Sequence, residues 1–176
     1  RDEQASSGKE LVLKTGVNQG VPITFYNLFT SGAPVVFAKT TAKTADDYLA
    51  MAKASQGKKG RAQTVIRLTN QALALRPSEQ GYFLRAYAKN DLEDYQGAIA
   101  DYNMSIKIDP DGADASTYNN RGSVKGQLGD YKGAIVDLDK AIEIYPQYSP
   151  FHVNRGIAKD QSGDYQGAIA DYDKAI

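Results

Sequence analysis

The sequence predicts an all-α array of stacked helix pairs, and two observations lead to this fold class. Residues 94–102 (DYQGAIADY) recur as DYKGAIVDL at 130–138 and as DYQGAIADY at 164–172, at steps of 36 and 34 residues. A fixed period of this size is typical of supersecondary units that stack on one another. Moreover, about 34 residues hold two helices of ordinary length and two turns. Each unit should therefore be a helix pair.

The composition excludes several classes of protein and site. Lys and Arg total 21, as do Asp and Glu, so a nucleic-acid binder that relies on a basic field is not expected. The chain has no cysteine, which excludes disulfides, thiolate metal sites and a cysteine nucleophile. No apolar run approaches the length of a membrane span, so we expect a soluble chain, in the cytoplasm or exported. Because the chain begins at Arg1, we expect a processed form from which any signal peptide is already removed.

The residues before the repeats have a different character. Residues 1–10 are polar and predict a disordered lead. In residues 11–43, two β-prone runs flank a glycine-containing turn, which is typical of a β-hairpin, and the segment is expected to be short and irregular or such a hairpin. The alternative is a short helix from Pro22, with Phe25, Leu28 and Phe29 at helical spacing. This segment is too apolar for a free tail, so we expect it to pack on the first helix pair.

Helical signals begin at Thr44, an N-cap that is followed by the first-turn acids Asp46 and Asp47. Gly57 and Gly60 interrupt this first helix, and a second helix over 61–75 ends before Pro77. The later pairs are expected at 79–92 with 94–108, at 115–128 with 130–144, and at 149–162 with 164–176. These pairs divide the array, 44–176, into repeats 46–78, 79–114, 115–148 and 149–176, of which the last is truncated.

The second helices share an unusual start. Asp94, Asp130 and Asp164 stand where these helices begin and are good N-caps. A glycine follows three residues later in each, at positions 97, 133 and 167. Glycine inside a helix costs up to ~1 kcal/mol relative to alanine. Its repetition predicts that close packing between helices requires the missing side chain.

The third unit resembles the tetratricopeptide repeat, in its bacterial type, through Tyr118, Gly122, Leu128-Gly129-Asp130-Tyr131, Ala134, Leu138, Ala141 and Pro146. The second unit departs from the pattern at Glu93 and Ser105, and the fourth has His152 where an aromatic is usual. Repeat 46–78 lacks the Asp-Tyr pair and is a degenerate copy. The resemblance covers 46–176. It implies a right-handed superhelix of antiparallel helix pairs, an α-solenoid, that binds a peptide or protein segment in a concave groove.

The resemblance also implies which residues line that groove, on the first helix of each repeat: Phe83, Leu84, Tyr87, Asn119, Asn120, Ser123, Asn154 and Ile157. Asn120 and Asn154 fall where the family hydrogen-bonds a bound backbone, and an amide can both donate and accept. The alternative is that they merely face solvent. Phe83, Leu84 and Tyr87 would form an apolar floor or contact residues 11–43. The basic set with which some relatives clamp a chaperone tail is missing, which argues against that partner.

Three charged residues repeat in register: Arg85, Arg121 and Arg155, then lysines at 89, 125 and 159, and aspartates at 101, 137 and 171. They form either a basic stripe for an acidic partner or an Arg–Asp pair inside every repeat. We favour the pair, because residues that repeat with the fold usually serve the fold. Such a half-buried pair would contribute ~1 kcal/mol or little more.

No pattern in the chain predicts catalysis, a metal or a cofactor. There is no recognisable Ser–His–acid arrangement, no glycine-rich phosphate loop, and a single histidine, His152. Groove aromatics could stack on single-stranded nucleic acid, but the neutral net charge disfavours this. We therefore expect a non-enzymatic protein-interaction scaffold. The alternatives are a self-assembly module that stacks end to end, in which residues 165–176 contact a neighbouring chain, and a regulatory or targeting domain of a larger protein.

Overall fold

The computed structural model describes residues 14–18, 21–25, 42–110 and 114–176, and it divides into two units, 1–42 and 43–176. In the first unit, strands β1 (Lys14–Asn18) and β2 (Val21–Phe25) pair antiparallel, with Gly16 opposite Ile23. The structure thus has the hairpin rather than a helix from Pro22. The disordered lead expected for 1–10 lies outside the described residues. Packing of 11–43 on the first helix pair remains a prediction.

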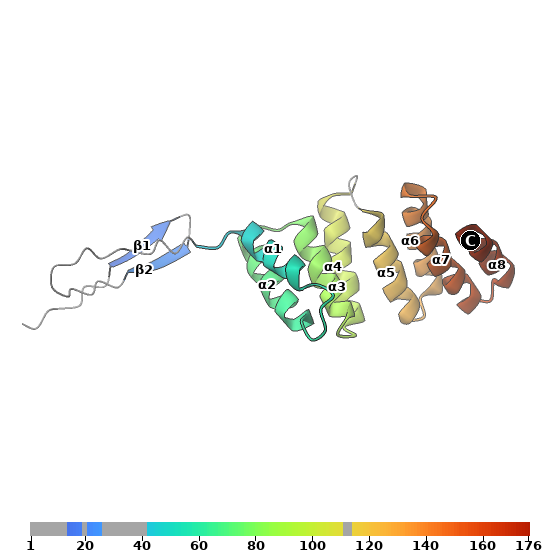
Figure 1. The fold of residues 1–176 in the computed structure, drawn as a ribbon, viewed down its shortest axis with the longest axis horizontal. Coiled ribbons are helices and arrows are strands. Elements are labelled where there is room, and N and C mark those ends of the chain that lie inside the picture. Colours follow the sequence, from blue (N-terminus) through green and yellow to red (C-terminus); the bar gives the residue numbers. More distant parts are fainter. Residues whose placement is uncertain (1–13, 19–20, 26–41, 111–113) are drawn as a thin grey trace, which may run out of the picture. The chain divides into compact units, whose positions relative to one another are not determined.

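The second unit is an array of four helix pairs (Figure 1). The pairs are α1 (Ala45–Ser55) with α2 (Ala62–Leu75), α3 (Glu79–Asn90) with α4 (Tyr95–Ile108), α5 (Ala115–Gln127) with α6 (Tyr131–Ile144), and α7 (Ser149–Gln161) with α8 (Tyr165–Ala175). All the helices expected from the sequence are confirmed, with ends within two residues of the expectation. The all-α solenoid fold is therefore confirmed for this unit.

Local capping explains why the first helix begins and ends where it does. The Thr44 hydroxyl accepts from the Asp47 N–H at 3.2 Å, and the Asp47 carboxylate accepts from the Thr44 N–H at 2.7 Å. This reciprocal capping box satisfies two backbone donors that would otherwise lack partners. After α1, Gly57 and Gly60 take φ of 68° and 72°, a left-handed conformation that favours glycine and ends the helix.

The glycines at the start of the second helices have a different cause from the one that the sequence suggested. The Gly97 N–H donates to Asp94 Oδ1 at 3.0 Å, and a Cβ added at Gly97 would lie 2.2 Å from Asp94 Oδ2. Gly133 and Gly167 have the same relation to Asp130 and Asp164. The missing side chain thus makes room for the capping carboxylate. Our prediction that helix-to-helix packing requires these glycines was wrong.

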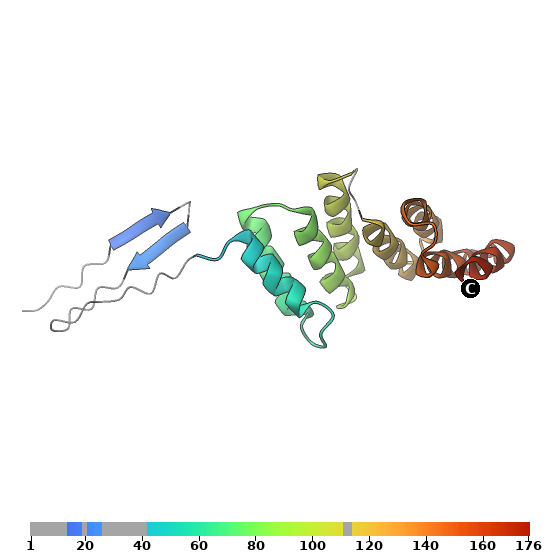
Figure 2. The ribbon, with the colours of Figure 1, turned by 45° about the horizontal axis from the view of Figure 1, so that its top comes forward.

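The helix pairs follow one another in chain order along the array (Figures 1 and 2). Each helix contacts the next one along the chain, from α1 through α8. In addition, α1 contacts α3, α3 contacts α5, and α5 contacts α7, whereas within the described residues no second helix contacts another second helix. The repeats therefore approach one another more closely on the side of the first helices, which makes that side the inner face.

Small residues allow the two helices of a pair to approach. A Cβ added at Gly122 of α5 would lie 3.1 Å from the Ala134 carbonyl oxygen and 3.1 Å from Leu138 Cγ of α6. At Gly156 of α7, an added Cβ would lie 2.5 Å from the Tyr172 ring of α8. Ala86 holds the same place in α3 and is fully buried. The closest approach within each repeat therefore depends on the absence or small size of one side chain.

A buried carboxylate joins the two helices of each of the last three repeats. Arg85 donates to Asp101 from Nε at 2.8 Å and from Nη2 at 2.6 Å, and Lys89 Nζ lies 2.8 Å from the same carboxylate. The groups Arg121–Lys125–Asp137 and Arg155–Lys159–Asp171 repeat this arrangement, which we call the triad. The three aspartates are buried. The hypothesis of an Arg–Asp pair inside each repeat is therefore confirmed over that of a basic stripe.

The same arginines also tie each repeat to the one before it. Arg85 Nη1 donates to Asn70 of α2 at 2.7 Å, and Arg121 Nη1 donates to Asn103 of α4 at 2.7 Å. Arg155 Nη1 donates to Asp139 of α6 at 2.6 Å. One guanidinium thus connects three helices: its own, its partner in the repeat, and the second helix of the preceding repeat.

The first repeat replaces the triad with hydrocarbon. Leu68 is the counterpart of Asp101 in the first repeat, because it lies 33 residues earlier, the same spacing that separates Asn70 from Asn103. Its side chain is 2% exposed. It packs in one cluster with Leu49 and Val65. Residues 46–78 thus form a helix pair that apolar packing, rather than a buried charge, holds together at this position.

Ala134→Leu should destabilise the protein. Ala134 is buried against Gly122, so a larger side chain must displace α5 or α6, and overpacking costs ~1–3 kcal/mol. Urea unfolding followed by circular dichroism measures this. Val136→Leu on the same helix is the matched control, because Val136 is 61% exposed and should change stability by no more than about 0.5 kcal/mol. Equal midpoints for the two variants would contradict the packing described here.

Acid should weaken the last triad. Burial raises the pKa of Asp171, but hydrogen bonds from Arg155 and Lys159 outweigh it and lower that pKa to about 2, from a reference value of 3.8. The carboxylate therefore stabilises the fold fully above about pH 4, and this stabilisation is lost as the pH falls toward about 2. Asp171→Asn should cost ~1–3 kcal/mol at neutral pH.

Unfolding midpoints measured across this acidic range should fall less steeply for Asp171→Asn than for the wild type. Asp173→Asn on the same helix is the control, since Asp173 is exposed and does not belong to the triad. Parallel pH profiles for the wild type and Asp171→Asn would refute a stabilising role for the Asp171 charge.

Candidate functional site

The candidate site is the inner face formed by α3, α5 and α7. The residues expected to line it all lie on these helices: Phe83, Leu84 and Tyr87 on α3, Asn119, Asn120 and Ser123 on α5, and Asn154 and Ile157 on α7. The three helices contact one another in turn, α3 with α5 and α5 with α7. Two hollows and a row of amides subdivide the inner face.

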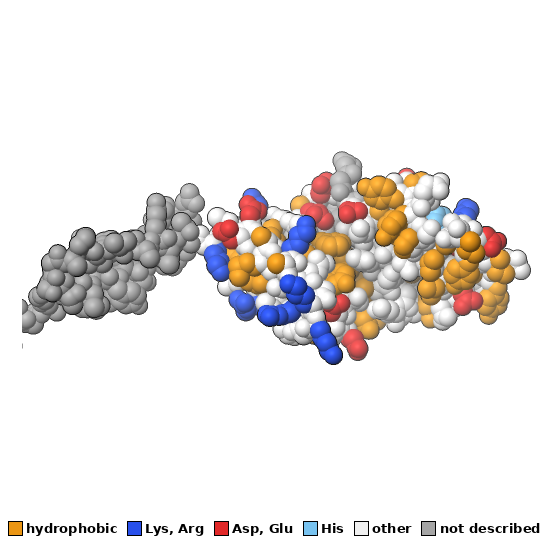
Figure 3. Space-filling view, in the orientation of Figure 1, with side chains coloured by type: hydrophobic (Ala, Val, Ile, Leu, Met, Phe, Trp, Pro, Cys, Tyr) orange, Lys and Arg blue, Asp and Glu red, His pale blue; other side chains and the backbone are white. Residues whose placement is uncertain are grey.

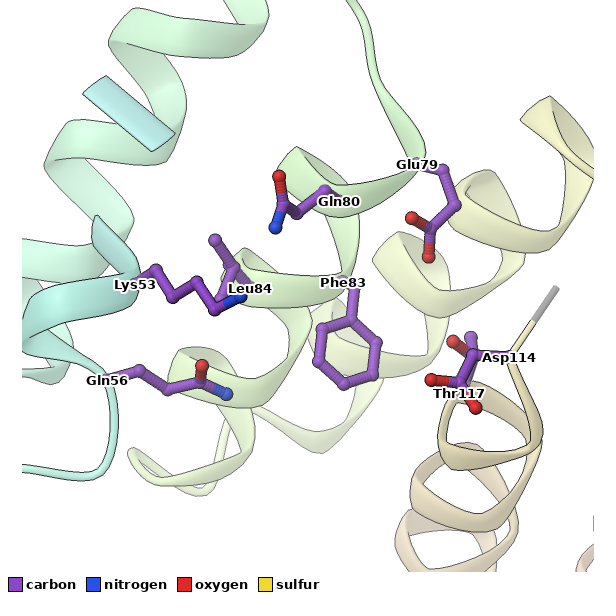
Figure 4. Close-up of a pocket in the computed structure, with 8 residues that line it drawn as sticks. All are labelled: Lys53, Gln56, Glu79, Gln80, Phe83, Leu84, Asp114 and Thr117. Atoms are coloured by element: carbon purple, nitrogen blue, oxygen red, sulfur yellow. The ribbon is translucent and has the colours of Figure 1, made fainter. Parts of the chain in front are cut away.

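The first hollow lies between α1, α3 and α5 and measures about 240 Å³ (Figure 4). Its lining residues are Lys53, Gln56, Glu79, Gln80, Phe83, Leu84, Asp114 and Thr117. Phe83 projects between a wall from α1 and a wall from α5 (Figure 4). Leu84 is only 2% exposed and packs in the core with Leu49, so it contributes more to folding than to an accessible surface.

The second hollow lies over α6, between α5 and α7, and measures about 410 Å³. Tyr131 of α6 is partly exposed and Ile157 of α7 is 49% exposed, whereas Ala134 and Leu138 of α6 are buried beneath the hollow. The other lining residues are uncharged: Gly122, Ser123, Gly126, Gln127, Asn154, Ala158 and Gln161. This hollow therefore suits an apolar group that is flanked by hydrogen-bonding groups.

An amide row connects the repeats on this face. Asn154 Nδ2 of α7 donates to Asn119 Oδ1 of α5 at 2.7 Å, and Asn119 Nδ2 donates to Asn120 Oδ1 at 3.2 Å. These bonds hold the three side chains in fixed orientations. Each amide offers two donor hydrogens and two acceptor lone pairs, so the row uses only part of its capacity.

Buried polar atoms without partners lie near Asn120. The Tyr102 hydroxyl and the Asn90 side-chain carbonyl oxygen are buried, and neither has a hydrogen-bond partner within the described residues. Burial raises the pKa of Tyr102, Asn120 lowers it, and Tyr87 and Asp91 raise it further, which identifies these residues as its neighbours. Burial also raises the pKa of Asp91.

Sequence reasoning missed part of the site. It did not include Tyr131 and Leu138, because they belong to the second helix α6, and only the folded array brings them to the lining of this hollow. The available signal was the pair Gly122 and Gly126, which removes side chains from two successive turns of α5. It also missed Lys53 and Asp114, whose helices meet α3 only in the folded array.

His152 has a structural role. Its ring is buried, and Nε2 lies 2.7 Å from the Pro146 carbonyl oxygen, so that nitrogen carries the hydrogen and donates. Nδ1 faces Asp171 at 3.8 Å. Across the described ranges, no group of three or more His, Cys, Asp or Glu residues could hold a metal ion, and no helix in those ranges is long and apolar enough to cross a membrane.

Family comparison agrees with this geometry. Models of the tetratricopeptide repeat match residues 79–111 and 115–148, the second and third helix pairs. The chain belongs to the tetratricopeptide-repeat family. Members of this family are protein-interaction scaffolds, and their fold is typical of proteins without enzymatic activity. This tetratricopeptide-repeat chain is thus a scaffold for protein partners.

Solved structures show the same fold. The repeat protein is similar to a crystal structure of MamA, with a TM-score of 0.68 at 22% identity over 74% of this chain and 75% of that one. A MamA structure from Desulfovibrio magneticus RS-1 gives a TM-score of 0.68 at 19% identity, over 74% and 73%. MamA MSR-1 gives 0.65 at 18%, over 77% of each chain. No curated protein matches the chain by sequence.

Proposed function

We propose that this tetratricopeptide-repeat chain binds an extended peptide or protein segment along the inner face of α3, α5 and α7. The observation that supports this most is the row Asn120, Asn119 and Asn154, which lies between two hollows. Each residue of a bound peptide has one backbone N–H donor and one carbonyl acceptor, and an asparagine side chain can pair with either group. Side chains of the bound segment would enter the hollows while its backbone follows the row.

The groups on this face suit binding rather than catalysis. The histidine is buried and donates to the Pro146 carbonyl oxygen. The second hollow is uncharged, which suits an apolar side chain rather than a phosphate. Together with a formal net charge of zero, this favours a peptide over a nucleic acid as the partner. We therefore assign the chain a non-enzymatic function.

The amide row can be tested with a displayed library of random decapeptides. Peptides selected on the wild type are synthesised and titrated by fluorescence polarisation. Asn120→Ala with Asn154→Ala should weaken their binding by roughly 1–3 kcal/mol, because amide contacts to the backbone are lost. Gln96→Ala with Gln166→Ala is the control, since these exposed amides lie on second helices. If both double variants bind equally well, the ligand does not use the row.

Self-association through α8 is a second candidate function, favoured by an exposed apolar face. Ile135 of α6 packs in a cluster with Ala158 of α7, whereas Ile169, its counterpart 34 residues later, is 53% exposed. Tyr165 is 64% exposed on the same helix. Apart from Asp171, whose charge is neutralised inside the triad, residues 160–176 hold three acidic residues and one basic, whereas 43–61 hold five basic and two acidic. Opposite ends of two copies are thus complementary in charge (Figure 3).

Light scattering after size-exclusion chromatography tests this stacking. The apparent mass should rise with protein concentration and fall at high salt, since screening weakens contacts between exposed charges. Ile169→Glu should keep the chain monomeric, because it places a charge in the apolar face. Val136→Glu, at an exposed position of α6, should associate as the wild type does. A wild type that stays monomeric at high concentration would exclude α8 as a self-association surface.

A further inference from the structure

We infer that the first hollow is a subsite for a basic side chain, arginine above all, of the segment that the groove binds. This inference rests on the proposed function and adds the residue that the groove selects. The hollow has a flat aromatic surface and two carboxylates: Phe83 and Glu79 from α3, and Asp114 from the start of α5. Figure 4 shows Phe83 between the α1 wall and the side on which Glu79 and Asp114 lie.

The two carboxylates lack a cation within the described part of the chain. Glu79 Oε1 accepts from the Ser105 hydroxyl at 3.0 Å, and Asp114 Oδ1 accepts from the Ser116 N–H at 3.1 Å. Neither makes an ion pair there, in contrast to the triad aspartates. The hydrogen-bond donors to Glu79 and to Asp114 each use a single oxygen of the carboxylate. The second oxygen of each carboxylate is therefore available to a donor from a ligand.

An unpaired hydroxyl lines the same hollow. Thr117 of α5 is fully buried, and its Oγ1 has no hydrogen-bond partner within the described residues. Leaving a buried hydroxyl unpaired is unfavourable, and such groups are rare in folded proteins. A donor or acceptor supplied by a bound side chain would relieve this cost. Thr117 therefore indicates a ligand independently of the two acids.

The shape and charge of the hollow favour arginine. A planar guanidinium stacks on an aromatic ring and donates through several N–H groups at once, which suits Phe83 with Glu79 and Asp114. Among the described residues, Lys53 is the one cation that lines the hollow, and it forms no ion pair with either acid, so the lining is net negative. An anionic ligand would meet two carboxylates and one ammonium, which disfavours it.

The test uses capped single residues as probes on the ¹⁵N-labelled chain. The methylamides of Nα-acetyl-arginine, Nα-acetyl-norleucine and Nα-acetyl-glutamate are titrated separately, and NMR follows the backbone amides of Phe83 and Thr117. The arginine probe should shift both amides and bind roughly fivefold more tightly than the norleucine probe, as expected for exposed ion pairs. The glutamate probe should bind more weakly than either.

Glu79→Gln with Asp114→Asn should remove the preference for arginine over norleucine. Both changes keep the local structure, since the glutamine side chain still accepts from the Ser105 hydroxyl and asparagine is a good N-cap. Asp173→Asn is the control, an exposed acid on α8 that should leave the preference intact. Equal binding of the three probes, tighter binding of the glutamate probe, or a preference that survives the double variant would each overturn the inference.

These probes report on the first hollow alone, so the two proposals can fail separately. If library peptides need Asn120 and Asn154 but the arginine probe shifts neither Phe83 nor Thr117, the basic subsite is overturned and the groove stands. If the probe binds with the expected preference while the asparagine variants bind peptides normally, the subsite is supported and the amide row is not.

Discussion

The buried triad is the interaction on which the rest of the array depends. Asp101, Asp137 and Asp171 lose almost all contact with water, and a buried carboxylate is costly unless cations and hydrogen bonds surround it. An arginine bonds each one through two nitrogens, and a lysine from the next turn bonds it as well. Since the third arginine nitrogen reaches the preceding repeat, the same charge sets the pairing of helices and the stacking of repeats.

This use of charge also determines the character of the inner face. Along α3, α5 and α7, the repeated arginines and lysines point into the helix pairs and neutralise aspartates there. The positions toward the groove are left to amides, small residues and aromatics. The face over α5 and α7 is consequently uncharged and rich in donors and acceptors, whereas the hollow beside α1 holds three charged residues. A segment bound along the face would therefore meet two different chemical environments.

Small residues serve two purposes in the same helices. Gly122 lets α5 approach α6, where any Cβ would contact Ala134 and Leu138. Gly122 and Gly126 also line the second hollow, between α5 and α7. Packing and binding surface thus arise from one sequence feature. The glycines after Asp94, Asp130 and Asp164 differ, since they accommodate a capping carboxylate within their own helix.

The sequence by itself determined the helix pairs and their boundaries, because caps, prolines and a 34-residue period are local signals that repeat. It favoured the Arg–Asp pairing over a basic stripe but did not decide between them. It also placed Asn119, Asn120 and Asn154 on the first helices, where the fold aligns them. Only the tertiary structure decided that Leu84 is core, that Tyr102 is buried without a partner in the described part of the chain, and that Lys53, Glu79 and Asp114 share one hollow. The physical reason is distance along the chain: these contacts join residues of different repeats, and their geometry depends on how closely the helices stack.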